Sequence, residues 1–373
     1  MALCHEWLNA RHGSEKTFEA MAAALPAAAV HALTLQPSAD FAFGGRPVHT
    51  TFLDHPRLRD RGRALQLPLM PLAWRYASRD PYDVVVTSSH ACAKGFWPAR
   101  AALHLCYCYT PMRYAWLADI DRRRPRRSMA SRAGERALRA WDLRSVAWVD
   151  GFAAISTTVA RRIEEFYGRP AVVIHPPVDT DRFTPGDPGD REGFALAVAR
   201  LVPYKRLDLA IRAADRLRHP LVVAGAGPEE GRLRSLAAEL SADVRFVVDP
   251  SDDDLAALYR GAGVLVFPAE EDFGIVPVEA QACGTPVVAY GSGGALDTVV
   301  AGETGVLVAE QTAGALAAGI EAVLGGRFDA AACRRNAERF SRARFRDQFL
   351  DWVVTSAAAA NVRIDDPRIS QSA

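Results

Sequence analysis

Short apolar runs alternate with longer segments of mixed polarity along almost the whole chain. Such runs, ended by glycine, proline or small polar residues, are typical of strands buried in a parallel sheet, and the segments between them have the length and spacing of helices. The expected strands are residues 2–8, 30–35, 48–52, 82–87, 103–109, 151–156, 194–198, 221–227, 244–248, 264–268 and 305–308. The expected helices cover 14–25, 57–76, 159–167, 207–216, 252–259, 313–324 and 334–358, and two more begin near 229 and 276. Pro68 and Pro71 are expected to interrupt or kink the second of these helices.

The alternation of strand and helix occurs twice, which predicts two α/β domains. Residues 1–185 form the first domain, 194–340 the second, and 186–193 the linker between them. We expect two doubly wound, Rossmann-like domains facing an interdomain cleft. Residues 341–360 are expected to be a helix that crosses back to the first domain, and 361–373 a disordered tail.

Composition limits the partners and the compartment. The 373 residues carry 45 basic and 44 acidic side chains, a formal net charge of +1, which argues against a nucleic-acid partner. Six cysteines in a chain of this length do not indicate a disulfide framework, and residues 1–8 lack a signal-peptide pattern. We therefore expect a cytoplasmic protein. Cys106 and Cys108 would share one face of a strand, but no cluster of His or Cys completes a metal site, so we expect no bound metal.

Membrane contact is expected to be peripheral at most, because no apolar run is long enough to span a bilayer. One segment, Arg122 to Arg144, holds nine arginines against two acids. Such a segment is typical of a solvated loop and helix face. It would also suit contact with anionic headgroups at the inner membrane face, and both interpretations remain open.

The densest chemistry lies between 267 and 294. A strand ends before Glu271, the chain passes through Phe273 and Gly274, and a helix follows that carries Glu279. Free N–H groups at a helix N-terminus favour an anion, so Gly274 and Ile275 can donate to a phosphate. A glutamate one turn further in can accept hydrogen bonds from sugar hydroxyls. The pattern therefore predicts a sugar nucleotide as the ligand.

Two cations flank another strand-to-helix turn in the second half. Arg200 and Lys205 lie on either side of the turn that follows strand 194–198, so both can converge on one diphosphate. The strand 221–227 ends in glycines, and Gly225 is expected to allow close approach of a backbone. In the first half, strand 82–87 runs into Ser88, Ser89 and His90, which places polar groups at the edge of the sheet where ligands bind.

These residues carry a family resemblance. Glu271, Phe273, Gly274 and Glu279, followed by GTPVV at 284–288 and by Gly293 and Gly294, resemble the donor-site signature of the retaining glycosyltransferases of family 4. The resemblance covers nearly the whole chain and is strongest from 200 to 294. It implies the GT-B architecture and transfer of a hexose from a nucleoside diphosphate donor to a hydroxyl of a glycan, a lipid-linked sugar or a small molecule, with retained anomeric configuration.

The resemblance also implies roles for individual residues. Arg200 and Lys205 match the pyrophosphate clamp, Glu271 would hold the donor hexose, and Glu279 the ribose. The main chain of strand 244–248, at Val247, would border the nucleotide base, and His90 would contact the donor sugar. Gly13, in the first strand-to-helix loop, would approach the donor phosphate. The family usually has two glycines in that loop, and here His12 replaces the first.

The string CYCYTPMRYAW at 106–116 resembles a loop in a branch of the family that includes mannosyltransferases of surface-polysaccharide assembly. This favours guanosine diphosphate mannose as the donor, with uridine diphosphate sugars as the alternative. Within this loop Arg113 and Trp116 could hold a sugar or could pack the domain edge.

Three competing functions remain open at this point: a sugar-nucleotide epimerase, a nicotinamide-dependent oxidoreductase suggested by the glycines near Gly225, and a sugar-nucleotide-binding protein without turnover. Gly13 could equally be a simple turn glycine.

Overall fold

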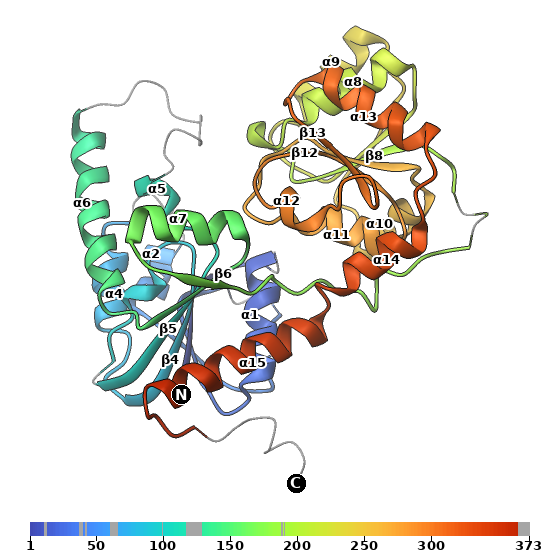
Figure 1. Ribbon diagram of the computed structural model, residues 1–373. Coiled ribbons are helices and arrows are strands. Elements are labelled where there is room, and N and C mark those ends of the chain that lie inside the picture. The colour runs from blue at the N-terminus through green and yellow to red at the C-terminus, as the bar shows by residue number, and fades with distance from the viewer. Residues whose placement is uncertain are drawn as a thin grey trace. The chain divides into compact units, whose positions relative to one another are not determined.

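The chain divides into two compact units. The computed structural model (Figure 1) describes residues 1–10, 13–36, 40–41, 43–59, 66–98, 100–116, 129–187, 189 and 191–364. The first unit combines Met1–Pro177 with the chain from Ala343 onward, and the second unit is Val178–Arg342. Each unit is built on its own parallel sheet.

The first unit contains a seven-stranded sheet in the order β3-β2-β1-β4-β5-β6-β7. The strands are β1 (Ala2–Leu8), β2 (Ala29–Leu35), β3 (Val48–Thr50), β4 (Pro81–Ser89), β5 (Arg100–Cys108), β6 (Gly151–Ala154) and β7 (Ala171–Val173). The α-helices assigned to this unit are α1 (Gly13–Ala24), α2 (Pro56–Arg59), α4 (Met70–Arg75), α5 (Arg113–Trp116), α6 (Met129–Val146), α7 (Thr157–Tyr167) and α15 (Arg342–Ala359), with 3-10 turns at η1 (Phe52–Asp54) and η2 (Ala93–Gly95). Every residue of β1 is buried, because both faces of the sheet are covered.

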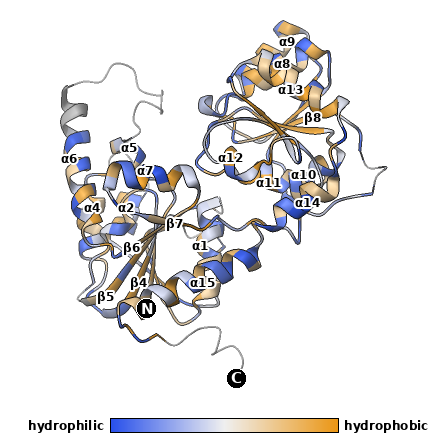
Figure 2. Cartoon of the chain, in the orientation of Figure 1, coloured by the Kyte–Doolittle hydropathy of each residue, from blue (hydrophilic) through white to orange (hydrophobic). Residues whose placement is uncertain are grey.

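The second unit contains a six-stranded sheet in the order β10-β9-β8-β11-β12-β13. The strands are β8 (Ala195–Val198), β9 (Leu221–Ala224), β10 (Val244–Val247), β11 (Val264–Phe267), β12 (Val287–Tyr290) and β13 (Gly305–Val308). Its helices are η4 (Pro203–Lys205), α8 (Leu207–Leu217), α9 (Glu230–Leu240), α10 (Asp252–Gly261), α11 (Ile275–Ala282), α12 (Ala295–Thr298), α13 (Ala313–Gly325) and α14 (Ala330–Glu338). Figure 2 shows the apolar strands at the centre of each unit. The prediction of two doubly wound, Rossmann-like parallel sheets is confirmed.

The predicted single helix over 334–358 is wrong. The chain forms α14, breaks at Arg339 to Ser341, and begins again as α15. At the break, the carbonyl of Phe340 accepts a hydrogen bond from the N–H of Val178 at 2.8 Å, and Val178 forms a β-bridge with Ser341. A long-range backbone contact therefore replaces the helical hydrogen bonds at this point.

The segment after Val178 belongs with the second unit, although we had expected the first domain to continue to residue 185. Arg334 of α14 explains this, because its guanidinium donates to the carbonyls of Thr180 and Phe183, each at 2.7 Å. Helix α15 lies with the first unit, as Figure 1 shows, and the ring of Phe345 packs edge-on against Tyr107 of β5 at 5.9 Å. The expected tail lies largely outside the described residues, which end at 364.

The expected helix over 57–76 is represented by α2 and α4, and residues 60–65 between them lie outside the described chain. Pro71 falls in the first turn of α4, where a missing N–H is tolerated.

Two glycines of the second unit sit where one backbone touches another. A Cβ at Gly294 would lie 2.2 Å from the Cα of Phe273, and the N–H of Gly294 donates to the carbonyl of Glu271 at 2.8 Å. A Cβ at Gly225, whose φ is +133°, would lie 2.0 Å from the carbonyl oxygen of Ala199. The close approach expected at Gly225 is thus one between two loops of this chain.

Three histidines are buried in the first unit and are held neutral by burial. Loss of solvation lowers the pKa of His5, His31 and His104 to about 4 each. The second unit, residues 178–342, contains one histidine, His219.

We predict that acid destabilises the first unit before the second. The unfolded chain binds protons on these histidines near pH 6.5, whereas the folded chain does so only near pH 4, so the free energy of unfolding falls as the pH drops through this window. Each histidine contributes on the order of 2–3 kcal/mol to that fall. Denaturant titrations followed by hydrogen exchange at pH 7 and pH 4.5 would measure it, and equal losses in both units would contradict the prediction.

We further predict that Gly294→Ala destabilises the second unit by about 3 kcal/mol or more, because the new methyl group meets backbone atoms that cannot rotate away. The matched control is Gly314→Ala on α13, where a Cβ meets nothing within 4 Å. There the lower entropy of the unfolded chain should raise stability by about 0.5–1 kcal/mol. Thermal unfolding of both variants gives the comparison, and equal stabilities would refute the packing argument.

Candidate functional site

The strand order of the second sheet reverses beside β8. From β8 the chain moves outward to β9 and β10 on one side, and β11, β12 and β13 extend on the other. In an open α/β sheet this reversal separates the loops that follow the two central strands, and ligands bind in the gap at the carboxyl ends. The loops after β8 and β11 carry Lys205 and Glu271, both predicted site residues.

Lys205 and Glu271 meet at this point. The Lys205 ammonium forms a direct ion pair with Oε1 of Glu271, and the two side chains are 13% and 22% exposed. The ammonium also lies over the ring of Tyr204, 5.2 Å from its centroid. A cation and a carboxylate are therefore held together between the loops that follow β8 and β11, where they can exchange partners for the phosphate and the hydroxyls of a ligand.

Arg200 follows the same strand but is not part of this pair. It is exposed, and its guanidinium has no hydrogen bond or ion pair with any of the residues that the structure describes. The structure thus brings one of the two predicted clamp cations to Glu271 and leaves the other at the surface of the same loop.

The helix after Glu271 begins as the sequence predicts. Gly274 precedes α11 with φ 87°, a left-handed conformation that glycine adopts readily, and Ile275 is the first helical residue. No side chain among the described residues caps this helix, and its first turn contains no acid. The N-terminus of α11 therefore presents backbone donors and the positive end of the helix dipole.

Phe273 and Glu279 fix the two ends of this segment. Phe273 is buried and packs against Phe340 with ring centroids 5.6 Å apart, which anchors the loop. Glu279, one turn inside α11, accepts a hydrogen bond at 2.8 Å from the hydroxyl of Tyr259 on α10. Burial, with the nearby charge of Glu279, raises the pKa of Tyr259, so this hydroxyl keeps its proton and orients the carboxylate. Val247 ends β10, where its carbonyl accepts the N–H of Gly225 at 2.9 Å.

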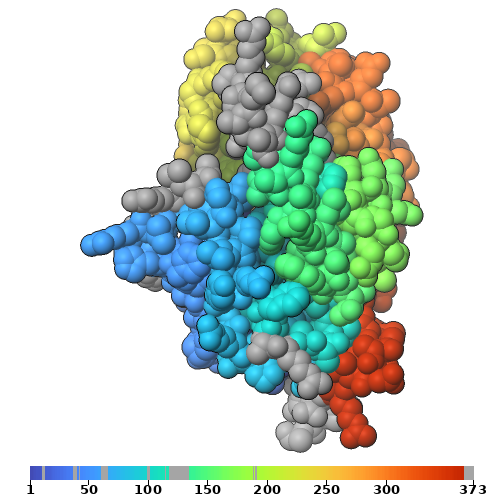
Figure 3. All heavy atoms as spheres, turned by 90° about the vertical axis from the view of Figure 1, so that its left-hand side faces the viewer, coloured from blue at the N-terminus to red at the C-terminus, as the bar shows by residue number. Residues whose placement is uncertain are grey.

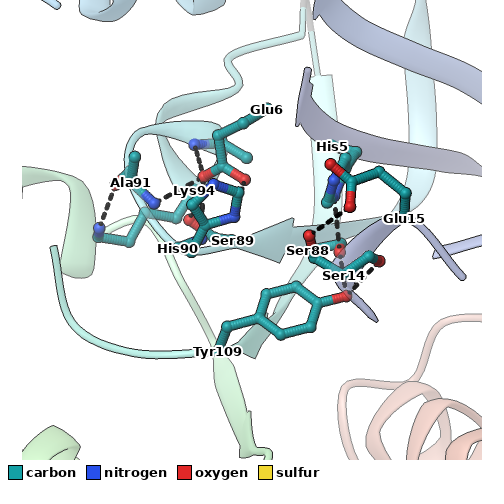
Figure 4. A network of polar contacts seen from close by, with 11 residues as sticks. His5, Glu6, Ser14, Glu15, Ser88, Ser89, His90, Ala91, Lys94 and Tyr109 are labelled. Carbon is teal, nitrogen blue, oxygen red and sulfur yellow. Dashed lines mark hydrogen bonds and ion pairs between the residues drawn. The ribbon is translucent and has the colours of Figure 1, made fainter. Parts of the chain in front are cut away.

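In the first unit the strand order reverses between β1 and β4. The carboxylate of Glu6, near the end of β1, is fully buried there. Its Oε1 accepts hydrogen bonds from the Ser89 hydroxyl at 3.0 Å and from the N–H groups of His90, Ala91 and Ala93 at 3.0, 2.8 and 3.1 Å (Figure 4). The loop that follows β4 is therefore wrapped around one buried carboxylate.

The same carboxylate orients His90. The Nδ1 atom of His90 lies 3.2 Å from Oε2 of Glu6, and Trp7 packs on the ring with centroids 4.8 Å apart. Burial alone would raise the pKa of Glu6, but His90, His5 and the backbone donors outweigh burial and lower it, so Glu6 is ionised. Because Nδ1 faces Glu6, Nε2 is the ring nitrogen through which His90 can meet a ligand.

A second chain of contacts runs beside the first in Figure 4. Nδ1 of His5 lies 3.0 Å from the Ser88 hydroxyl, which donates to the hydroxyl of Tyr109 at 3.0 Å, and Tyr109 donates to the carbonyl of Ser14 at 2.9 Å. Tyr109 thus links the end of β5 to the first turn of α1. Burial raises its pKa, which keeps the hydroxyl protonated.

Gly13 is the first residue of α1, and its carbonyl accepts the Thr17 hydroxyl at 2.8 Å. The hydroxyl of Ser14, the second residue of α1, donates to the carboxylate of Glu15 at 2.8 Å. His12 lies outside the described residues.

Trp116 packs the domain edge. Its ring stacks on Phe166 at 5.0 Å, and its Nε1 donates to Asp142 at 2.8 Å. Asp142 also forms a buried ion pair with Lys94, one of three lysines in the chain. These contacts explain the position of Trp116 as packing within the first unit, so no bound sugar is needed to explain it.

Glu6 and Tyr259 are the residues that sequence reasoning missed. Glu6 lies within the apolar run ALCHEWL, and a carboxylate inside a buried strand was the available signal, because burial of a charge requires donors close by. Tyr259 carried no comparable signal, since a tyrosine on a helix is ordinary.

The described residues contain no group of three His, Cys, Asp or Glu side chains arranged to hold a metal ion. Asp179, part of the Asp-Thr-Asp sequence at 179–181, pairs with Arg342 at 3.0 Å. Within the same residues, no helix is both long enough and apolar enough to span a bilayer. Of the segment from Arg122 to Arg144, residues 122–128 lie outside the described chain and the remainder belongs to α6.

Comparison with known families divides the chain near residue 180. Residues 11–182 match the model of Glycosyltransferase Family 4, and residues 179–340 match that of Glycosyl transferases group 1. The second match contains the Lys205 and Glu271 pair and helix α11.

Curated relatives carry the name D-inositol 3-phosphate glycosyltransferase. The protein from Geodermatophilus obscurus is 37% identical over 320 residues, which cover 76% of this chain and 69% of the relative. The protein from Mycobacterium tuberculosis (strain ATCC 25177 / H37Ra) is 40% identical over 194 residues, 45% of this chain and 40% of the relative.

Solved structures share the fold. HepE of Anabaena, in complex with UDP and glucose, superimposes with a TM-score of 0.68 at 19% identity over 95% of this chain and 99% of that one. Sucrose-phosphate synthase of Thermosynechococcus elongatus gives 0.73 at 20% identity over 96% and 100%. With both halves matched by glycosyltransferase families and a relative 37% identical across most of its length, the chain belongs to the group 1 glycosyltransferases of the family 4 type, with the GT-B fold.

Proposed function

We propose that this protein is a retaining, metal-independent hexosyltransferase that uses a nucleoside diphosphate sugar. The contact of Lys205 with Glu271, at the strand reversal of the second sheet and beside the N-terminus of α11, carries the proposal. This arrangement offers a cation and backbone donors for a diphosphate and a carboxylate for sugar hydroxyls. A sugar nucleotide combines those groups.

The reaction breaks the bond between the anomeric carbon of the hexose and an oxygen of the β-phosphate. The acceptor hydroxyl attacks the anomeric carbon from the face that the phosphate leaves, and the departing phosphate oxygen takes the hydroxyl proton. The products are a glycoside and a nucleoside diphosphate. Negative charge builds on the diphosphate, where Lys205, Arg200 and the N–H groups of Gly274 and Ile275 would stabilise it.

Glu271 would bind the donor hexose, and Glu279 the ribose through the oxygen atoms that Tyr259 orients. Val247 would border the base, and His90 would contact the sugar through Nε2, with Glu6 holding the ring. Gly13, at the start of α1, would approach the donor phosphate. The positive charge supplied by this chain makes a divalent cation unnecessary in the proposed reaction, which we place in the cytoplasm.

The proposed donor is guanosine diphosphate mannose, supported by the likeness of residues 106–116 to mannosyltransferase sequences. Uridine diphosphate glucose is the second candidate, because HepE was solved in complex with UDP and glucose. Among acceptors, the names of the curated relatives favour an inositol phosphate as the small-molecule case, beside glycans and lipid-linked sugars.

The donor experiment is thermal unfolding in the presence of guanosine, uridine and adenosine diphosphates, their hexose esters and nicotinamide dinucleotides. A bound ligand at a hundred times its dissociation constant adds about 2.7 kcal/mol of stability. We expect guanosine diphosphate and its mannose ester to stabilise the protein selectively. Stabilisation by uridine compounds alone would overturn the mannose assignment, and stabilisation by nicotinamide dinucleotides alone would overturn the transferase.

The matched variants for this experiment are Lys205→Ala and Arg212→Ala. Loss of a charge-assisted hydrogen bond should weaken diphosphate binding about tenfold to a hundredfold in Lys205→Ala. Arg212 is an exposed cation of α8 with no partner among the described residues, and its replacement should leave binding unchanged. Equal effects of the two variants would remove Lys205 from the site.

A separate prediction concerns His90. His90→Ala should lower kcat by about a hundredfold through lost positioning of the sugar, while the dissociation constant of the nucleoside diphosphate stays nearly the same. His55→Ala, an exposed histidine of the same unit, is the control. Steady-state kinetics and calorimetric binding separate the two quantities, and a large loss of nucleotide affinity in His90→Ala would refute the role assigned to the imidazole.

A further inference from the structure

A groove of about 230 Å³ lies on the first unit, lined by Arg75, Tyr76, Ser78, Arg79, Trp97 and Pro98. Tyr76 to Arg79 lead into the start of β4, and Trp97 and Pro98 lead into β5. The groove is therefore at the amino edge of the sheet. From Pro81 to Ser89, the two ends of β4, the rise of about 3.3 Å per residue separates the groove by about 26 Å from the carboxyl edge that carries Ser89 and His90. It is a surface distinct from the candidate active site.

Four large apolar side chains are exposed on and beside α4, and two of them, Tyr76 and Trp97, line the groove. Tyr76 is 58% exposed, Trp97 48%, Leu72 48% and Leu69 38%. On α4, Met70, Ala73 and Trp74 face the core, whereas Leu69, Leu72 and Tyr76 recur at helical spacing on the outer face. The helix is thus apolar on two sides, and the residues that the structure describes cover only one of them.

Two cations accompany the apolar stripe. The guanidinium groups of Arg75 and Arg79 have no ion pair or hydrogen bond with any described residue, and none of the six groove residues is acidic. The nearest acid in sequence, Asp80, accepts the Ser78 hydroxyl at 3.4 Å and pairs with neither arginine. An anionic partner would satisfy both charges.

The exposed apolar side chains beside the two arginines distinguish between a small anion and a larger anionic partner. A small anion in the groove would contact the arginines but would leave Leu69 and Leu72 in water. A lipid bilayer with anionic headgroups would cover all of them, because its phosphates meet the arginines, Tyr76 and Trp97 suit the headgroup boundary, and the leucines reach the acyl chains. In Figure 3 the chain around α4 (light blue), the segment leading into β5 (cyan) and α6 (green) appear on one face of the first unit.

We infer that this α4 surface, formed by Leu69, Leu72, Arg75, Tyr76, Arg79 and Trp97, docks the protein on anionic phospholipid bilayers. The inference does not depend on the proposed reaction, since the surface and the candidate site lie at opposite edges of the sheet.

The test is flotation of the full chain with vesicles of phosphatidylcholine alone and of equal parts phosphatidylcholine and phosphatidylglycerol. We expect selective binding to the anionic vesicles that high salt weakens. Arg75→Gln combined with Arg79→Gln should lower the partition coefficient about thirtyfold, at the usual contribution of a basic residue near such a surface. Leu72→Ser combined with Tyr76→Ser should lower it for both vesicle types.

The matched control is Arg136→Gln with Arg144→Gln on α6, two exposed arginines that make the same change in charge. This pair should keep near-normal vesicle binding. If it abolishes binding while the groove pair does not, the contact belongs to α6 and the inference falls. Displacement by soluble glycerol phosphate would also overturn it, since the groove would then bind a free phosphate.

The midpoint of thermal unfolding of every α4 variant should stay close to that of the parent chain, which shows that each is folded. Loss of vesicle binding with an unchanged unfolding midpoint supports docking through α4. Retention of full vesicle binding in both α4 pairs refutes it, whatever the outcome for the transferase reaction.

Discussion

Both candidate sites depend on one constraint of parallel sheets, the reversal of strand order. Where the strand order reverses, the loops that follow the two adjacent strands run in opposite directions. The space between the carboxyl ends of these two strands therefore stays open. In the first unit this happens between β1 and β4, and in the second between β8 and β11. Glu6 with His90, and Lys205 with Glu271, occupy those two positions. The pairs are far apart in the sequence, and the topology brings them together.

Buried charge then fixes the local geometry of the first unit. A carboxylate without water is costly unless donors surround it, and Glu6 obtains four of them on one oxygen from the loop after β4. The position of His90 is thus determined by a residue on another strand more than by the loop that carries it. Lys94, four residues further on, is held in the same way by Asp142 of α6. The loop is anchored at both ends by buried charges of opposite sign.

Most of the fold could be read from the chain because the strands are short apolar runs with clear ends. Strand 305–308 and the helix after Gly274 are examples in which the pattern and the structure agree within a residue. The break between α14 and α15 could not be predicted, because its cause is Val178, whose backbone reaches Phe340 from the opposite end of the second unit. The spacing of apolar residues along 334–358 cannot predict a contact with a residue so far away in the sequence.

In the candidate site, too, local sequence patterns predicted some residues, whereas contacts between distant parts of the chain could not be predicted. Lys205 and Glu271 were predicted as members of one site, and their contact in the structure follows from the strand order. Gly225 was singled out for close approach, and the structure supplies a reason within the chain, the carbonyl of Ala199. Glu6 escaped notice because an acid inside an apolar run has no partner in sequence; its donors belong to a loop that only the sheet brings near.

The assignment of α15 to the first unit has a consequence for the order in which the protein is completed. The second unit is one continuous stretch, Val178–Arg342, whereas the first needs residues from both sides of it. During synthesis the ribosome delivers the first sheet early, but α15, whose Phe345 packs against Tyr107, emerges only after the whole second unit. The unit that is synthesised first is therefore completed second. Until α15 packs against it, the apolar surface beside Tyr107 stays exposed while the second unit is synthesised.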